Sequence, residues 1–155
     1  MKVRGTHLKG IEPIPIPIFR GEDTEFLLAG PVDLEIFDES CPPPKPVMTM
    51  RPGGQSEPDY KNAKYVTQLD EYAKKRIGYM IFKSLQATDG IEWEKFEEGK
   101  SDTYLLWQEE LRDYGLNNFE INRVISTVME ANSLTEDRVT EARKSFLAQR
   151  RRAKV

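Results

Sequence analysis

The sequence predicts an α+β chain made of a small N-terminal β-hairpin or sheet, a Pro-rich connector and a C-terminal bundle of about four helices. Apolar residues first alternate with prolines and acids, prolines and glycines then crowd one stretch, and apolar residues afterwards recur at steps of three and four. The expected parts are a β-rich segment over residues 1–40, a linker over 41–58, a helical domain over 59–149 and a basic tail over 150–155.

Two alternating stretches support the β-rich part. Residues 11–18 are IEPIPIPI, and because proline has no N–H to donate, this stretch can pair along one side at most. It is expected to be an edge strand or an extended, polyproline-like arm. In residues 32–37 apolar and acidic side chains alternate, which predicts a strand with its acids facing water.

The stretch over residues 41–58 is expected to be a linker or a wrapped arm, because its prolines and glycines prevent helix and discourage sheet. These residues are Pro42, Pro43, Pro44, Pro46, Pro52, Gly53, Gly54 and Pro58. The pair Gly53-Gly54 lacks the Lys-Ser or Lys-Thr that follows the glycines of a phosphate-binding loop, so a turn is expected there.

The longest helix is expected from Asp59 to about Gln86, where a turn cluster over 88–90 ends it. Its apolar residues form a single stripe on one side of the helix. They are Tyr65, Leu69, Tyr72, Ala73, Ile77, Met80, Ile81 and Leu85.

Three shorter helices are expected to follow. Residues 89–102 form an irregular segment whose Ile91, Trp93 and Phe96 are expected to cap an open end of the helical core. One helix begins after the N-cap Asp102, runs from Tyr104 to about Tyr114 and ends at Gly115. Its expected buried residues are Leu105, Leu106, Trp107 and Leu111.

The next helix follows Asn118, and Thr135 is expected to cap the last one. The expected buried face of the first comprises Ile121, Val124, Ile125, Val128 and Met129. That of the second comprises Val139, Ala142, Phe146 and Leu147.

Charge is segregated along the chain, although the net charge is only −3. Residues 21–40 contain seven acids and no base, whereas residues 138–155 contain seven bases against Glu141 alone. The net negative charge of the chain argues against nucleic acid as a partner. Because the two ends of the chain have opposite charge, each end could bind a different partner. The single cysteine fits a reducing compartment, so the cytoplasm is expected. No apolar run is as long as a signal peptide or a membrane span, so the protein is expected neither to be exported by that route nor to be embedded in a membrane.

No set of residues predicts an enzyme. His7 is the only histidine, so it is expected to be a solvated tail residue rather than part of a metal site or a triad. Cys41 is flanked by prolines, not by a base that would lower its pKa. The adjacent acids Glu97-Glu98 and Glu109-Glu110 diverge on a helix. We therefore expect no catalytic, cofactor-binding or metal site.

Some residues are candidate partner contacts. The Ile-Pro segment, with Ile14, Ile16 and Ile18, is already extended, so docking it on a partner would cost little ordering entropy. Apolar and aromatic residues of the helical part are the other candidates, with a buried core role as the alternative for each. They are Tyr65, Leu69, Tyr72, Trp93, Phe96 and Trp107.

Three segments resemble tail assembly chaperones of long-tailed bacteriophages. They are CPPPKPVMTMRPGG at 41–54, YVTQLDEYAKKRIGYMIFKSL at 65–85, and GLNNFEINRVISTVMEANSLTEDRVTEARKSFL at 115–147. In that family, small cytoplasmic proteins bind the tape-measure protein and keep it soluble until the tail tube polymerises around it. They are absent from the finished virion, and some are also made as a frameshifted longer form.

The resemblance implies an assembly factor in the bacterial cytoplasm whose partners are the tape-measure protein or other tail proteins, and it transfers no site residue. A homo-oligomer is compatible with this function. One alternative is a structural virion subunit, such as a tail tube, connector or head-tail joining protein. Another is a nucleic-acid-binding regulator that uses the basic residues 150–154.

Overall fold

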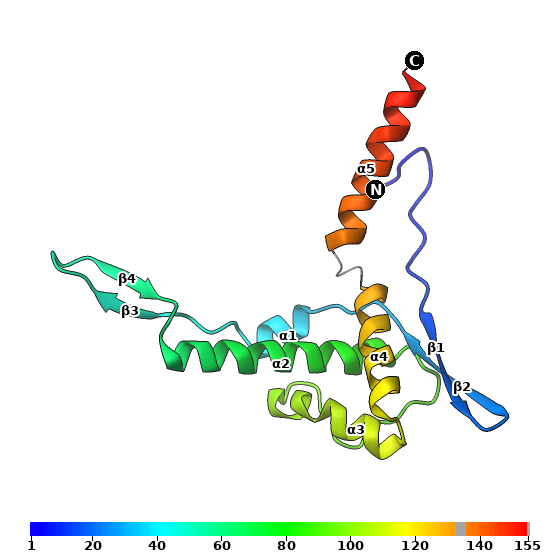
Figure 1. Ribbon diagram of the computed structural model, residues 1–155, viewed down its shortest axis with the longest axis horizontal. Coiled ribbons are helices and arrows are strands. Elements are labelled where there is room, and N and C mark those ends of the chain that lie inside the picture. The colour runs from blue at the N-terminus through cyan, green and yellow to red at the C-terminus, as the bar shows by residue number, and fades with distance from the viewer. Residues whose placement is uncertain (133–135, 155) are drawn as a thin grey trace. The chain divides into compact units, whose positions relative to one another are not determined.

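The computed structural model describes residues 1–132 and 136–154, and it confirms the α+β class (Figure 1). The four strands pair as two separate antiparallel hairpins, β1 with β2 and β3 with β4. The elements in chain order are β1 (Ile14–Arg20), β2 (Asp23–Ala29), α1 (Glu35–Ser40), β3 (Val47–Met50), β4 (Ser56–Asp59), α2 (Ala63–Leu85), the 3-10 helix η1 (Ser101–Leu106), α3 (Trp107–Tyr114), α4 (Asn118–Ala131) and α5 (Glu136–Ala153). No helix in the described ranges is long and apolar enough to cross a membrane.

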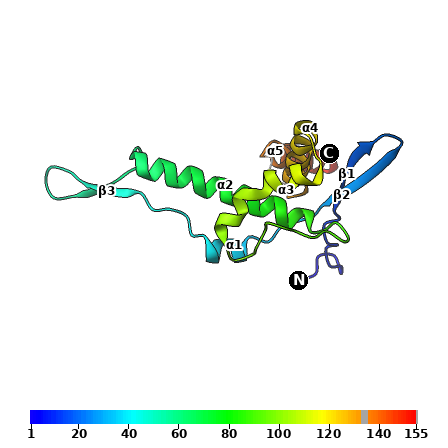
Figure 2. The ribbon, with the colours of Figure 1, turned by 90° about the horizontal axis from the view of Figure 1, so that it is seen from below.

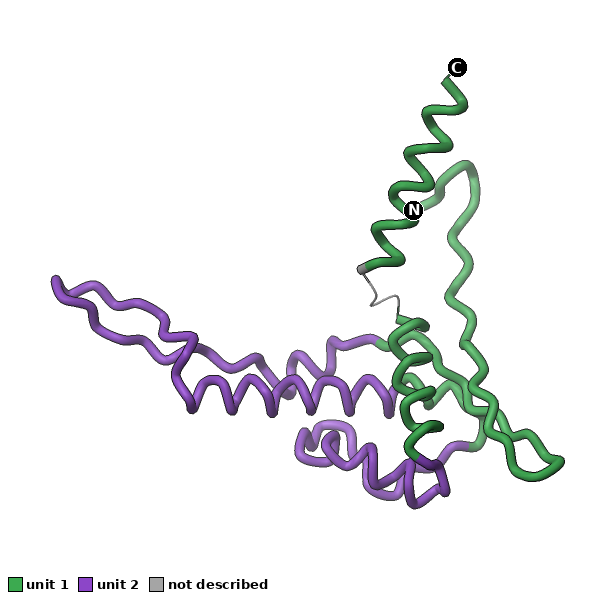
Figure 3. Tube along the Cα trace, in the orientation of Figure 1, with its two compact units in different colours: residues 1–32, 84–90, 118–155 green, residues 33–83, 91–117 purple. Residues whose placement is uncertain are grey.

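The chain divides into two compact units built from interleaved segments (Figure 3). Unit 1 comprises Met1–Val32, Ser84–Gly90 and Asn118–Val155. Unit 2 comprises Asp33–Lys83 and Ile91–Asn117. Each unit therefore depends on contacts between segments that are distant in the sequence.

The Ile-Pro segment of unit 1 is an edge strand. Ile14, Ile16 and Ile18 of β1 face residues of β2, and the prolines alternate with them. Because residues two apart direct their N–H groups to the same side, Pro15 and Pro17 lie where an N–H would point away from β2. The prolines therefore remove no hydrogen bond from the hairpin. Gly21, with φ +60°, opens the two-residue turn between the strands.

The core of unit 1 lies between this hairpin and α4. Ile16 and Ile18 of β1 are buried together with Leu27 and Ala29 of β2. On α4 the buried apolar residues are Ile121, Val124, Val128 and Ala131, while Ile125 and Met129 are half-buried. The expected helix and most of its expected face are therefore confirmed.

Polar contacts fasten the hairpin to α4. Arg20 donates to both carboxylate oxygens of Glu120, over 2.7 and 2.9 Å. Arg123 donates to the carbonyl of Pro17, which faces away from β2. At the other end of α4, the side-chain oxygen of Asn132 accepts the N–H of Val32 over 2.8 Å.

The last two residues of α2, Ser84 and Leu85, belong to unit 1, where Ser84 pairs with the chain beyond β2. Gly30 donates its N–H to the carbonyl of Ser84, and the Ser84 hydroxyl donates to the carbonyl of Gly30 over 2.8 Å. The hydroxyl of Thr88 accepts the N–H of Leu28 and donates to its carbonyl. These contacts satisfy backbone groups on the outer edge of β2.

The expected buried face of α5 is wrong. Val139 is half-buried, whereas Ala142, Phe146 and Leu147 are exposed. The apolar spacing is present, but the described part of the chain supplies no surface that covers it. The predicted cap Thr135 lies outside the described residues.

The strand expected at 32–37 is also wrong, because the chain forms the short helix α1 there. The carboxylate of Asp33 accepts the N–H of Glu35 over 2.9 Å, which satisfies a free donor of the first turn. Phe37 is fully buried, while Ile36 is exposed. A helix of this length needs one buried anchor, and alternation over so few residues does not exclude it.

The hairpin β3–β4 lies in the linker, where no sheet was expected. Pro58 faces Met48. Because Arg51 donates its N–H to the carbonyl of Gln55, the bonded pairs alternate and Pro58 lies in a pair without ladder bonds, so it costs none. Gly53 and Gly54 have positive φ and form the expected turn. Arg51 and Glu57 form an ion pair across it. The prolines before Val47 precede the strand and do not interrupt it.

The expected long helix is confirmed as α2, but its predicted start is wrong, because Asp59 belongs to β4 and α2 begins at Ala63. Asn62 caps its start, because the side-chain oxygen accepts the N–H groups of Lys64 and Tyr65. Burial is uneven along α2: Gly78 to Phe82 are all buried, whereas most residues before Gly78 are exposed. The expected stripe is therefore buried at Met80, Ile81 and Leu85 but not at Leu69, Ala73 and Ile77.

Asp102 is not the predicted N-cap, since it lies within η1, which leads into α3. Leu105 is exposed, in contrast to the expectation, whereas Trp107 and Leu111 are buried. The predicted end at Gly115 is confirmed. Gly115 adopts φ +113°, and the N–H of the next residue, Leu116, donates to the carbonyl of Leu111.

Gly78→Ala is expected to destabilise unit 2 severely. A Cβ at Gly78 would lie 1.8 Å from the carbonyl oxygen of Tyr104, so the backbone would have to move. We expect a loss of about 3 kcal/mol or more in the free energy of unfolding, measured by urea denaturation. Gly10→Ala is the control, because a Cβ there meets nothing within 4 Å. Equal stability of the two variants would contradict this packing.

Arg20→Ala is expected to weaken unit 1 by about 2 kcal/mol, because it leaves the buried carboxylate of Glu120 without its bidentate partner. Amide hydrogen exchange should become faster in β1 and at the start of α4. Lys9→Ala removes an exposed ion pair with Glu12 and should leave these rates unchanged. Unchanged exchange in the Arg20 variant would show that the contact is dispensable.

Candidate protein-binding surface

Phe37 lies at the centre of an aromatic cluster in unit 2. Its ring centroid is 5.7 Å from that of Tyr72, 5.5 Å from Tyr79 and 6.0 Å from Tyr104. Phe37, Tyr79 and Tyr104 are fully buried. One residue of α1 thus joins α2 to η1, and aromatic pairs at these distances add to the free energy of burial.

The irregular segment after α2 completes this cluster. Phe96 stacks on Phe82 with ring centroids 4.5 Å apart, and Trp93 meets Phe82 edge-on at 4.9 Å. Both side chains are half-buried, as expected for residues too apolar for a free loop. Glu110 holds the segment in place, because its carboxylate accepts the N–H groups of Glu94 and Lys95 over 2.7 and 2.9 Å.

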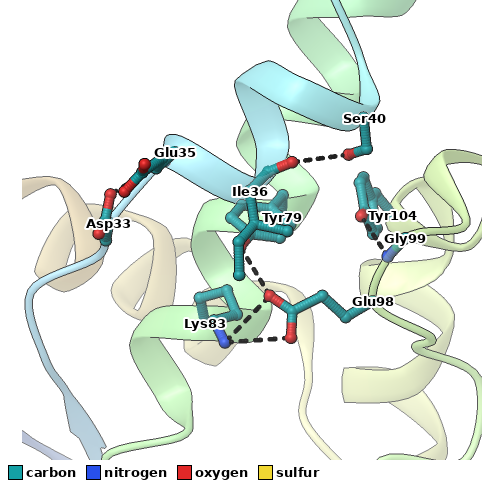
Figure 4. A network of polar contacts seen from close by, with 9 residues as sticks. All are labelled: Asp33, Glu35, Ile36, Ser40, Tyr79, Lys83, Glu98, Gly99 and Tyr104. Carbon is teal, nitrogen blue, oxygen red and sulfur yellow. Dashed lines mark hydrogen bonds and ion pairs between the residues drawn. The ribbon is translucent and has the colours of Figure 1, made fainter.

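A polar network borders the cluster (Figure 4). The hydroxyl of Tyr79 donates to Glu98 over 2.9 Å, and Lys83 pairs with the same carboxylate at 3.3 Å. The hydroxyl of Tyr104 accepts the N–H of Gly99 over 3.0 Å. Burial, the hydrogen bond to Glu98 and the negative charge of Glu98 raise the pKa of Tyr79 far above its ordinary value.

The side chains considered above for catalysis or metal binding are Cys41, His7 and the acid pairs that contain Glu98 and Glu110. Burial raises the pKa of the Cys41 thiol, opposed by the charge of Lys75. Glu98 and Glu110 bind groups of the protein itself, and His7 is exposed. Within residues 1–132 and 136–154, no group of three or more His, Cys, Asp or Glu side chains could hold a metal ion.

The first half of α2 carries an uncovered apolar face. Val66, Leu69, Ala73 and Ile77 follow one another at steps of three and four, so they lie on one side of the helix. Val66 is 50%, Leu69 42% and Ile77 36% exposed, and Ala73 is exposed too. We call these four residues the α2 stripe.

The hairpin β3–β4 adds further apolar surface to unit 2. It extends past the N-terminal end of α2 in both views (Figures 1 and 2). Met48 and Met50 project from the same face of β3 and are exposed. Methionine side chains are flexible and polarisable, which suits them to contact surfaces of varied shape.

The residues predicted to contact a partner differ in how exposed their side chains are. Leu69 is exposed and lies in the α2 stripe; Tyr65, Tyr72, Trp93 and Phe96 are half-buried, and Trp107 is buried. In unit 1, Ile14 is half-buried and Ile16 and Ile18 are buried against α4. Their role in binding a partner stays a prediction.

Sequence reasoning did not single out Val66, Met48 and Met50. Val66 could have been found from its spacing to Leu69, Ala73 and Ile77, whereas the methionines gave no signal inside a proline-rich segment. No protein-family model matches the chain, and no curated protein or solved structure is found to be similar to it.

Tyr79→Phe is expected to change how stability depends on pH. At neutral pH the free energy of unfolding of the variant should be lower by about 1.5 kcal/mol, because the hydrogen bond to the charged Glu98 is lost. A raised pKa means that the folded state keeps the proton which the unfolded state releases above about pH 10, so the stabilisation by Tyr79 falls as pH rises further.

Urea denaturation at pH 7 and at increasing pH above 9 measures this difference. The gap in unfolding free energy between the natural chain and the Tyr79→Phe variant should narrow as pH rises. Tyr114→Phe, at an exposed position, is the matched control and should show a constant gap. A constant gap for Tyr79→Phe as well would contradict a buried, carboxylate-bound phenol.

Proposed function

We propose that the protein is an assembly chaperone that acts by binding alone and holds an apolar helical segment of a client along the α2 stripe. The observation that carries this proposal is the exposure of Val66, Leu69 and Ile77 on one side of a long helix. Aligned aliphatic side chains at this spacing suit the groove or face that an amphipathic helix packs against. The exposed Met48 and Met50 support an adaptable contact.

The proposed client is the tape-measure protein of a long-tailed bacteriophage. This choice rests on the resemblance of residues 41–54, 65–85 and 115–147 to tail assembly chaperones. A long helical protein exposes apolar stripes until its tube surrounds it, and covering those stripes would keep it in solution. The proposed place of action is the cytoplasm of the bacterial host.

The energetics favour a contact that can be released. Covering one exposed aliphatic side chain contributes about 1.5–3 kcal/mol, and association of two molecules costs at least about 4 kcal/mol. Three such side chains therefore give weak binding at each site. Copies that are joined to one another and bind along one client would raise the overall affinity by avidity, and each single contact would still open readily.

Co-expression with the longest helical protein encoded beside this chain tests the proposal. The client should stay soluble and co-elute with this chain in size-exclusion chromatography, and it should precipitate when the chain is omitted. Val66→Ser/Leu69→Ser should weaken binding by about tenfold for each residue. Lys64→Ser/Gln68→Ser is the matched control, because both residues are exposed on the other side of α2.

A client that stays insoluble in the presence of this chain would contradict the proposal. Equal loss of binding in the two double variants would move the contact away from the α2 stripe. Detection of the chain in purified virus particles would favour a structural subunit of the tail instead.

A further inference from the structure

The outer face of the hairpin β1–β2 is mostly apolar, and it is exposed near the tip of the hairpin. Alternate residues of a strand point to opposite faces, so the side chains on the face opposite α4 are those of Pro15, Pro17, Phe19, Thr24, Phe26 and Leu28. Phe19 is 62% and Phe26 55% exposed. Phe19 faces Thr24 and Phe26 faces Pro17, so the two rings are diagonal neighbours within reach of each other.

Three acids lie at the tip of the same hairpin. Glu22 lies in the turn, and Asp23 and Glu25 belong to β2, on the face opposite the two rings; all three are exposed. The only base of the hairpin, Arg20, is bound to the carboxylate of Glu120. The tip of β1–β2 therefore presents two phenylalanines within a negative field.

Helix α5 presents the opposite charge beside a similar apolar surface. Phe146 is 58% and Leu147 52% exposed. Residues 142–154, which surround them, contain six bases and no acid. The guanidinium of Arg150 lies 5.9 Å from the ring centroid of Phe146, so cation and ring form one continuous surface.

A helix of this kind needs a partner. An isolated helix of about 18 residues is marginally stable in water, and most helical stability in proteins comes from packing an apolar side. Residues 137–153 of α5 are exposed except the half-buried Val139. Its apolar residues Val139, Ala142, Phe146 and Ala153 nevertheless repeat at the steps of one helix face.

We infer that α5 of one copy docks on the outer face of the β1–β2 hairpin of a second copy. Phe146 and Leu147 would cover Phe19 and Phe26, and the bases of residues 142–154 would meet the acids of the hairpin tip. Opposite charge fixes the orientation and speeds the encounter, while the apolar side chains supply the affinity.

The reach of the chain favours a second copy over docking within one molecule. The inner face of the hairpin is occupied by α4, which ends at Ala131, and the next residue, Asn132, lies beside Val32. Four residue steps separate Asn132 from Glu136 and span at most about 14 Å. A helix on the opposite face of the sheet would have its axis about 20 Å from that of α4.

The proposed contact joins two different surfaces, so each copy keeps one free hairpin face and one free α5. Such a heterologous interface closes into a ring if the rotation between copies allows it and otherwise continues as a chain. The contact is independent of the α2 stripe. Self-association and client binding can therefore be tested separately.

Sedimentation velocity of the full chain over a wide range of concentrations tests the inference. The hairpin variant is Phe19→Ser/Phe26→Ser, and the helix variant is Phe146→Ser/Leu147→Ser. Each should raise the dissociation constant of self-association by about tenfold or more, and added salt should weaken the association of the natural chain. Leu8→Ser/Phe119→Ser is the control, because both side chains are exposed elsewhere in unit 1 and should not matter.

An equimolar mixture of the two variants is the decisive sample. Each variant keeps the surface that the other has lost, so one intact interface should form and the mixture should give a one-to-one complex that grows no further. A misfolded variant could not restore association in this way. An interface made of the same surface on both copies would not be restored by mixing.

Four results would overturn the inference. The natural chain could sediment as a monomer at every concentration, the mixture could remain monomeric, or nuclease treatment could abolish association. The last result would mean that nucleic acid bridges the basic helices. Association equal to that of the natural chain in both variants would place the contact elsewhere and would refute it as well.

Discussion

The close approach of η1 to α2 at Gly78 is the constraint on which unit 2 depends. Because Gly78 has no side chain, the carbonyl of Tyr104 can occupy the place where a Cβ would otherwise lie. This approach puts the ring of Tyr104 5.1 Å from that of Tyr79 and within reach of Phe37. Phe37 of α1 and Phe96 both pack on the ring of Tyr104, so the buried cluster relies on this approach.

The same constraint divides α2 into two halves with different surroundings. Around Gly78 and beyond it, aromatic residues of α1, η1 and the segment after α2 cover the helix. No segment in the described part of the chain covers Val66, Leu69, Ala73 and Ile77 in the same way, so an apolar repeat that could have been core is instead the exposed α2 stripe. The α2 stripe is exposed because α1, η1 and the segment after α2 do not extend over it. Aliphatic residues occur in the buried half of the helix too, so the exposure does not require a different kind of residue.

Unit 1 shows how one sheet can have two apolar faces with different roles. Ile16, Ile18, Leu27 and Ala29 are buried with α4, and the bidentate contact of Arg20 with Glu120 fixes the tip of the hairpin. The prolines of β1 leave its outer edge short of N–H donors, which disfavours the addition of another strand. The outer face, with Phe19 and Phe26, is then the surface open to a partner.

The amino-acid pattern by itself determined the α+β class, the helices α2 and α4, and the end of α3 at Gly115, because these depend on local periodicity and on a glycine at positive φ. It also determined the segregation of acids and bases that the inferred contact uses. Only the tertiary structure decided that residues 35–40 form a helix, that β3 and β4 pair within the proline-rich segment, and which apolar residues are covered.

Periodicity identifies the apolar side of an element but not the segment that covers it. Leu69 and Met80 belong to the same predicted stripe, yet Met80 is buried and Leu69 is exposed, since burial depends on Phe37 and Tyr104, distant residues that meet only in the folded chain. Phe146 follows the same rule, because α5 has the spacing of a buried helix without a covering surface among the described residues. The apolar spacing of α2 and of α5 can therefore be recognised in the sequence, whereas tertiary packing alone decided which of these apolar side chains are exposed.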